Sequence, residues 1–148
     1  MIKDKNTYDE QDQLNLKLVV GLHRSLQKDV KSLNATLAEY GLTTAQFGVL
    51  ETLYHKGDQR ICEIIDKTLS TSGNMTVVIK NLEKLGYISK SKDPNDGRAS
   101  IIALTEAGKK LISEIFPIHL KALREVFKSL NNEDKKTLSD LLKKMNGL

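Results

Sequence analysis

The stretch KSKDPNDGRASIIAL, residues 90–104, joins a tight turn to charged side chains. Two strand-like runs flank DPNDG, in which Pro94 presets a turn φ and the following Asn, Asp and Gly tolerate positive φ. Arg98 comes next, and its guanidinium can donate charge-assisted hydrogen bonds to carboxylates or phosphates. Taken alone, the pattern is typical of a plain hairpin with an exposed Arg98–Asp96 ion pair worth about 0.5 kcal/mol.

Catalysis and metal binding have little support in the residue pattern. The sequence has no G-x-S-x-G motif, no phosphate-binding loop and no distinctive pair of carboxylates. The histidines, His23, His55 and His119, are scattered without the spacing of metal ligands. We therefore expect no enzyme activity, no metal site and no cofactor.

The single cysteine, Cys62, excludes an internal disulfide and fits a reducing compartment. A redox or metal sensor would need a thiol with a lowered pKa and access to solvent. A lone helical cysteine is more often a small core residue, and the sequence RICEIID suggests that Cys62 is half buried.

The composition suits one domain, or two small and closely packed ones, in a chain of 148 residues. The sequence has no apolar run of about 18 residues that would predict a membrane span, and MIKDKNTYDEQDQ does not resemble a secretory signal. We therefore expect a cytoplasmic protein. The net charge of +4 is compatible with nucleic-acid binding, but the basic residues are too dispersed to locate a binding face.

Apolar side chains predict a long first helix over residues 12–38, because they recur at three- and four-residue steps. Gly41 is its expected C-cap, and Thr43 with Gln46 forms a capping-box pattern at the start of the second helix. Two short helices follow, from QRICEIIDKTL and SGNMTVVIKNLEKLG. The inner face of the latter is expected to contain Met75, Val78, Ile79, Leu82 and Leu85.

The second half of the chain begins with strands expected at residues 87–92 and 99–104. Thr105 then caps a long helix in which Pro117 should cause a kink, and Asn131 caps the last helix.

This order of elements predicts a mainly α protein with a small β-hairpin wing. Residues 42–104 form a winged helix-turn-helix, and residues 1–41 and 105–148 supply the flanking helices. The flanking helices are apolar along one stripe and need a covering surface, for which a symmetric partner chain is the simplest source.

Several motifs agree in order and spacing with one known family. NLEKLGYISKSKDPNDGRASIIALTEAGKKL contains L-E-x-x-G-x-I, then D-P-x-D-x-R, then L-T-x-x-G, and LTTAQFGVLETL matches the entry to the second helix. On these motifs the sequence resembles the multiple-antibiotic-resistance regulator (MarR) family of transcription factors over about residues 14–145. Two features depart from the family pattern: EIIDKTL replaces the usual Leu-Ala step, and the first helix lacks the cysteine of the peroxide-sensing branches.

The resemblance implies a homodimer whose terminal helices, residues 1–41 and 105–148, form the dimerisation region. Its two winged helix-turn-helix lobes are expected to bind a pseudo-palindromic double-stranded operator. Most family members repress transcription, and many release DNA when a small aromatic or phenolic ligand binds or when a cysteine is oxidised.

The resemblance also gives the wing a role, in which Arg98 enters the DNA minor groove. A narrow A·T-rich minor groove has an enhanced negative potential that attracts a guanidinium. We expect Asp96 to hold Arg98 through a charge-assisted hydrogen bond, and Lys90 and Lys92 to meet phosphates.

The helix of about residues 72–85 would read the major groove. Small residues at its N-terminus allow a close approach to phosphate, and Asn74 can pair with adenine while Thr76 and Val77 touch thymine methyls. Thr43, Thr44 and Gln46 can also meet phosphate, although a capping role alone is the simpler interpretation. The expected DNA-binding residues are Ser70, Thr71, Ser72, Gly73, Asn74, Thr76, Val77, Lys80, Lys84, Lys90, Lys92, Asp96 and Arg98.

An effector site is less clearly marked. His23, Tyr40, Phe47 and Tyr54 are the candidate ligand contacts, although aromatic residues at helical spacing more often belong to a core. Cys62 is the candidate redox site. The alternative function is a winged-helix protein-interaction module that does not bind DNA, and the polar face around Asn74 together with Arg98 argues against it.

Overall fold

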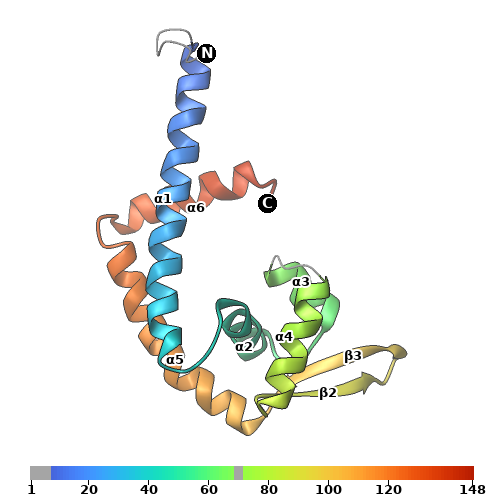
Figure 1. Cartoon of the computed structure of the whole chain (residues 1–148). Coiled ribbons are helices and arrows are strands. Elements are labelled where there is room, and N and C mark those ends of the chain that lie inside the picture. Colours follow the sequence, from blue (N-terminus) through green and yellow to red (C-terminus); the bar gives the residue numbers. More distant parts are fainter. Residues whose placement is uncertain (1–7, 69–71) are drawn as a thin grey trace, which may run out of the picture. The chain divides into compact units, whose positions relative to one another are not determined.

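The computed structural model describes residues 8–68 and 72–148, which contain the helices and strands shown in Figure 1. Contacts divide the chain into two compact units, residues 33–124 and residues 1–32 with 125–148. The elements are α1 (Glu10–Ala38), α2 (Thr44–Lys56), β1 (Gln59–Arg60), α3 (Ile61–Thr68), α4 (Ser72–Lys84), β2 (Ile88–Asp93), β3 (Asp96–Leu104), α5 (Glu106–Val126) and α6 (Asn132–Met145).

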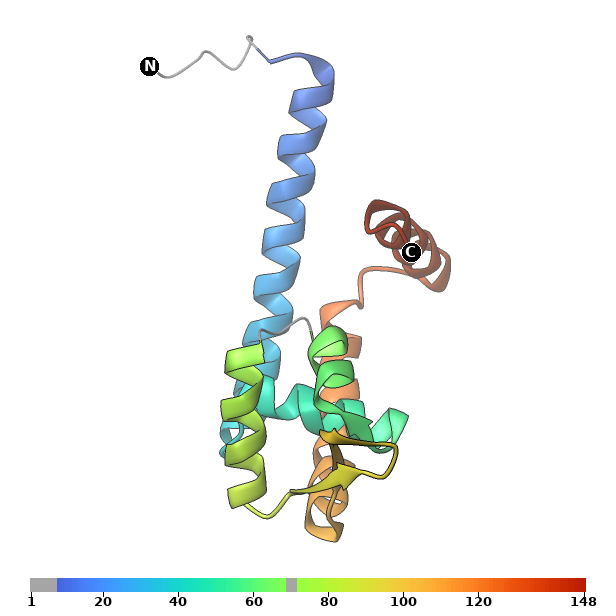
Figure 2. The same ribbon diagram turned by 90° about the vertical axis from the view of Figure 1, so that its right-hand side faces the viewer.

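The architecture is mainly helical with a small antiparallel wing, as the sequence predicts. The expected helices and both hairpin strands are present, and α4 leads directly into β2 in both views (Figures 1 and 2). A strand that the sequence did not predict, β1, pairs with β3, so the sheet order is β1-β3-β2. β1 has only two residues, too few for a periodic pattern to reveal it.

The predicted caps fix where the helices begin and end. Gly41 has a φ of 66°, and the N–H of Leu42 donates to the Leu37 carbonyl (3.2 Å) in the backbone geometry of a Schellman motif. The Thr43 hydroxyl accepts the Gln46 N–H (3.2 Å) while the Gln46 side chain accepts the Thr43 N–H (2.9 Å). Asn131 caps α6 in the same reciprocal way, so all three predictions are confirmed.

The core of residues 33–124 forms where the inner faces of the helices meet the sheet. Its fully buried side chains include Phe47, Leu50, Ile64, Met75, Leu82, Ile102, Ile112 and Ile115. Leu33 and Leu37, on the last turns of α1, belong to the same cluster. The prediction that Leu85 is buried is wrong, because it lies beyond the last residue of α4 and is 53% exposed.

The start of α5 lies directly against the connection between α4 and β2. The Thr105 hydroxyl donates to the Gly86 carbonyl (2.6 Å) and accepts the Gly108 N–H (3.1 Å), which confirms its predicted capping role. The N–H of Thr105 donates to the Tyr87 carbonyl (3.1 Å), and a Cβ at Gly108 would overlap that same carbonyl oxygen. α5 then continues through Pro117 to Val126.

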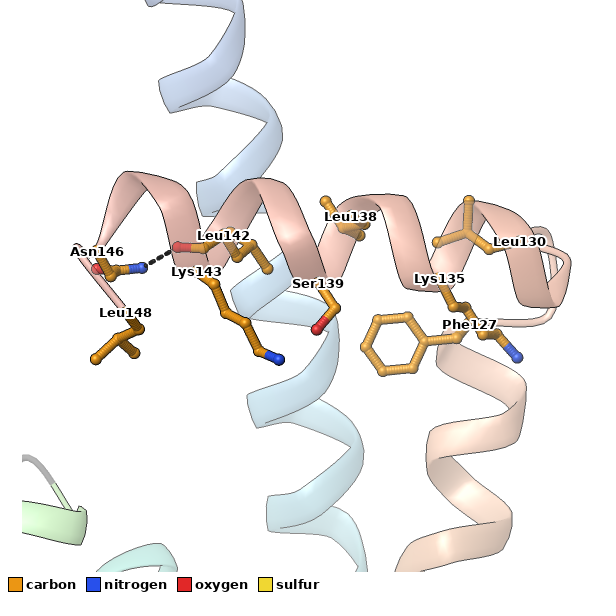
Figure 3. A pocket seen from close by; sticks show the side chains of 9 residues that line it. All are labelled: Phe127, Leu130, Lys135, Leu138, Ser139, Leu142, Lys143, Asn146 and Leu148. Atoms are coloured by element: carbon orange, nitrogen blue, oxygen red, sulfur yellow. Dashed lines mark hydrogen bonds between the residues drawn. The ribbon is translucent and has the colours of Figure 1, made fainter.

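In the unit of residues 1–32 and 125–148, large apolar side chains lie at the surface. The exposed ones are Tyr8, Leu14, Leu16, Leu18, Val19, Val20, Leu26, Val30, Phe127, Leu138, Leu141, Met145 and Leu148. Phe127, Leu130, Leu138, Leu142 and Leu148 also line a largely apolar groove of about 440 Å³ along α6 (Figure 3). Along the described residues, no helix is both long and apolar enough to cross a bilayer.

Replacing Gly108 by Ala should destabilise the protein by about 1–3 kcal/mol, because the new methyl group forces α5 away from Tyr87. Gly21→Ala is the matched control, since Gly21 also lies within a helix but has open space at its Cβ position. That substitution should stabilise by up to about 1 kcal/mol through helix propensity. Urea unfolding measures both, and equal stability of Gly108→Ala and wild type would contradict the close contact.

Candidate nucleic-acid interface

The outer face of α4 carries the polar residues that the sequence assigned to DNA. Met75, Val78, Ile79 and Leu82 are buried against the rest of the lobe, so the intervening positions face solvent. Val77 is 56% exposed, which leaves an apolar contact surface beside polar neighbours. The predicted DNA contacts among the exposed residues of α4 are Gly73, Asn74, Thr76, Val77, Lys80 and Lys84.

The N-terminal end of this helix is only partly covered by the described chain. Ser70 and Thr71 lie outside the described residues, and Ser72 is described only as the first residue of α4. Their predicted phosphate contacts therefore stay predictions.

The wing has a shorter turn than the sequence suggested. Asp93 and Asp96 pair with each other as the last and first residues of β2 and β3, so the turn consists of Pro94 and Asn95 alone. Gly97 belongs to β3 and does not have a positive φ, because the two-residue turn needs no left-handed residue there. The next pair in register is Lys92 with Ser100, and residues 97–99 therefore form a bulge without cross-strand partners.

Arg98 lies in this bulge with its side chain exposed. Its backbone N–H, rather than its guanidinium, donates to the Asp96 carboxylate (3.1 Å). The expected guanidinium–Asp96 ion pair is absent from residues 8–68 and 72–148, because the carboxylate is aimed at the backbone of the bulge. Lys90 and Lys92, on the adjoining strand, are exposed as predicted.

Sequence reasoning assigned no role to either residue of the ion pair at the wing. Arg60 Nη2 lies 2.5 Å from Asp93 Oδ2, and the Asp93 side chain is only 4% exposed. The Asn95 N–H lowers the pKa of the Asp93 carboxyl from its ordinary value of 3.8, burial opposes this shift, and Arg60 lowers the pKa further. The same pair raises the pKa of Arg60.

The start of α2 is engaged in local hydrogen bonds. Thr43 and Gln46 satisfy each other in the capping box, and the Thr44 hydroxyl donates to Asn34 Oδ1 (3.0 Å). These contacts support the capping interpretation for Thr43 and Gln46, whereas Thr44 bonds to α1.

An aromatic cluster joins α2 to α5. Phe116 lies with its ring centroid 4.7 Å from His55 and 6.2 Å from Tyr54, and the His119 ring lies 5.0 Å from Phe47. Phe47 is buried in the core, whereas Tyr54 is 45% exposed.

The other two candidate ligand contacts lie outside this cluster. Tyr40 packs on the core, and His23 belongs to the other compact unit, where its Nδ1 lies 3.3 Å from the Val19 carbonyl oxygen.

Cys62 is exposed, and the expectation of half burial is wrong. It occupies the second position of α3, where the inward face of the short helix is taken by Ile64. Among the described residues, no three His, Cys, Asp or Glu side chains are grouped so as to hold a metal ion.

Comparison with known proteins identifies the family. A model of the SarA/Rot transcriptional regulators matches residues 31–115. The HTH-type transcriptional regulator MhqR of Bacillus subtilis (strain 168) is 34% identical over 131 residues, covering 88% of this chain and 90% of that protein. This chain belongs to the MarR/SarA family of helix-turn-helix transcriptional regulators.

Solved structures agree with this membership. A MarR mutant from E. coli in complex with operator DNA superimposes with a TM-score of 0.81 at 25% identity, covering 93% of this chain and 99% of that one. BpsR of Bordetella bronchiseptica, whose DNA binding is regulated by 6-hydroxynicotinic acid, gives a TM-score of 0.79 at 28% identity, covering 88% and 98%. The MarR/SarA-family protein described here is thus a DNA-binding transcription regulator and not an enzyme.

Asp93→Asn should destabilise the protein above pH 4 and progressively less below it. The folded state lowers the pKa of Asp93, so its carboxylate adds stability above the ordinary value of 3.8, and this stability is lost as the pH falls through the folded-state value. The asparagine oxygen can still accept the Asn95 N–H, so the change mainly removes the charge. Urea unfolding of both proteins from about pH 3 to 7 measures the difference, and a pH-independent difference would contradict the assignment.

Proposed function

We propose that this MarR/SarA-family regulator is a homodimeric repressor that binds a pseudo-palindromic operator. The observation that carries the proposal is the continuity of α4 with the wing: one polar helix face leads into a hairpin whose bulge exposes Arg98. Asn74, Thr76 and Val77 would contact bases in the major groove, where amides and methyl groups discriminate base pairs. Lys80, Lys84, Lys90 and Lys92 would contact phosphates.

Arg98 is the proposed minor-groove contact. Its backbone is held by Asp96 while its guanidinium takes part in no ion pair within the described chain, so the charge is available to DNA. The related MarR structure in complex with operator DNA supports a role for this fold on duplex DNA. Half-sites about 10 base pairs apart would place two such lobes on one face of the duplex.

The exposed apolar side chains of α1 and α6 support dimerisation. Leu18 and Leu26 are each 62% exposed, and they lie eight residues apart on one face of α1. The groove along α6 adds Phe127 and Leu138 to the apolar surface of the same unit (Figure 3). A second copy of the chain would cover these faces and remove their apolar area from water.

Arg98→Ala should weaken binding to the preferred duplex at least tenfold and reduce the salt slope by about 1, because one cation no longer displaces counterions. The duplex is obtained by selecting binders from random sequences of about 30 base pairs, three helical turns. Fluorescence anisotropy across a salt series measures the affinity, and sedimentation should give a dimer for both proteins.

The matched control is Arg124→Ala, which removes an exposed arginine from α5 and should leave the affinity unchanged. Failure of the selection to enrich any sequence would reject sequence-specific binding and favour the protein-interaction module. A monomer in sedimentation would reject the homodimer.

We further propose that a small aromatic acid releases the DNA. The cluster of Tyr54, His55, Phe116 and His119 supplies rings for such a ligand, and the regulation of BpsR by 6-hydroxynicotinic acid supports the ligand class. Release by oxidation of the exposed Cys62 is the competing route.

In the same anisotropy assay, 6-hydroxynicotinic acid should lower the affinity of wild type and of Cys62→Ser alike, by about 5- to 150-fold, the usual range of coupling between sites. Hydrogen peroxide should have little effect on either protein. Peroxide-induced release that is lost in Cys62→Ser would instead establish the thiol as the sensor.

A further inference from the structure

We infer that the Arg60–Asp93 ion pair holds the wing tip in the orientation that directs the Arg98 side chain into the minor groove. The inference rests on the proposed function, because it concerns how the wing contact is made. It assigns to Arg60 and Asp93 a role in DNA affinity that neither would have as an ordinary surface pair.

The pair bridges two strands that are not neighbours. β3 lies between β1 and β2, so the Arg60 side chain reaches across the central strand to the end of β2. Ile101 is opposite both Arg60 and Ser91, and Asp93 lies two residues beyond Ser91 on the same strand. Strand alternation therefore puts Arg60, Ser91 and Asp93 on one face of the sheet.

The bulge explains why the wing needs this link. Beyond the Lys92–Ser100 pair, residues 97–99 have no cross-strand partners, so the ladder does not fix the direction of Arg98. Two carboxylates hold the tip instead: Asp93 accepts the Asn95 N–H (2.9 Å) and Asp96 accepts the Arg98 N–H (3.1 Å). Asp93 is the one of these two that is anchored outside the hairpin.

Arg60, the partner of Asp93, is itself held at the start of α3. The backbone N–H of Arg60 donates to Glu63 Oε2 (2.8 Å), which fixes the first turn of α3. α3 precedes α4, the proposed major-groove helix, and packs on it. The ion pair thus joins the wing tip to the element that leads into α4, so that the two DNA-contacting parts keep one relative orientation.

The burial of Asp93 makes loss of the ion pair unfavourable. The Asp93 side chain is 4% exposed, and a buried carboxylate without its cation is strongly unfavourable. Arg60 is 41% exposed, so a direct phosphate contact by its guanidinium is the competing role. Both roles predict weaker DNA binding when Arg60 is replaced, and the dependence of this loss on Arg98 separates them.

The test is a set of double-mutant cycles on the duplex selected above. Arg60→Gln and Asp93→Asn should each weaken binding about tenfold in the wild-type background. In the Arg98→Ala background neither should weaken it by more than about twofold, because the side chain that they position is already absent. Thermal unfolding of every variant confirms that the folded protein is being measured.

The control is Glu106→Gln, which breaks the exposed Lys109–Glu106 pair on α5 and should leave the affinity unchanged. Equal losses with and without Arg98 would overturn the inference, since they indicate a direct phosphate contact or a general structural role. Normal affinity of Asp93→Asn would overturn it too.

The design separates this inference from the proposed function. If Arg98→Ala weakens binding while Arg60→Gln and Asp93→Asn do not, only the positioning role is wrong. If Arg98→Ala itself has no effect, the minor-groove contact is wrong and the positioning role falls with it.

Amide hydrogen exchange without DNA gives an independent readout. Exchange of the Asn95 and Arg98 amides should accelerate in Arg60→Gln while that of α5 stays unchanged, because the tip loses its external anchor. Unchanged exchange at both amides would contradict the anchoring role.

Discussion

The burial of one face of α4 is the constraint on which the rest of the lobe depends. Met75, Val78, Ile79 and Leu82 are removed from water, and this fixes the helix's rotation about its own axis. The positions between them, among them Asn74 and Val77, must then face outward. A half-turn rotation would expose the buried side chains and hide the polar ones. The same hydrophobic effect that folds the lobe therefore also selects the surface that it offers to a partner.

Local rules made much of this structure predictable. The caps at Gly41, Thr43 and Asn131 depend on residues within a few positions of each other, and the amphipathic period of α4 assigned its two faces correctly up to Leu82. The prediction that Leu85 is buried failed because the apolar periodicity continues past Lys84, the last residue of α4.

Three features that sequence reasoning did not find, namely β1, the Arg60–Asp93 pair and the bulge at Arg98, depend on contacts between distant residues. β1 is a strand only because β3 lies beside it, and Arg60 meets Asp93 across 33 residues of chain. The bulge that carries Arg98 follows from the register of the sheet, which no local pattern in DPNDGR specifies. One signal was nevertheless present, since the first aspartate of the D-P-x-D-x-R motif is the buried carboxylate. An aspartate at this position of the motif could therefore have been predicted to pair with a basic side chain.

The backbone of Tyr87 connects α4, β2 and α5 at one point. The Tyr87 N–H donates to the carbonyl of Leu82 in the last turn of α4, and the Tyr87 carbonyl accepts the N–H of Thr105, the residue before α5. Gly108 places no side chain between that carbonyl and α5. At this junction backbone contacts backbone directly, without an intervening side chain at Gly108. A displacement of the start of α5 would therefore move the end of α4 and the base of the wing with it, because backbone hydrogen bonds and a close backbone contact join them. A force on α5 would thus shift α4 and the wing as one body rather than deform the junction alone.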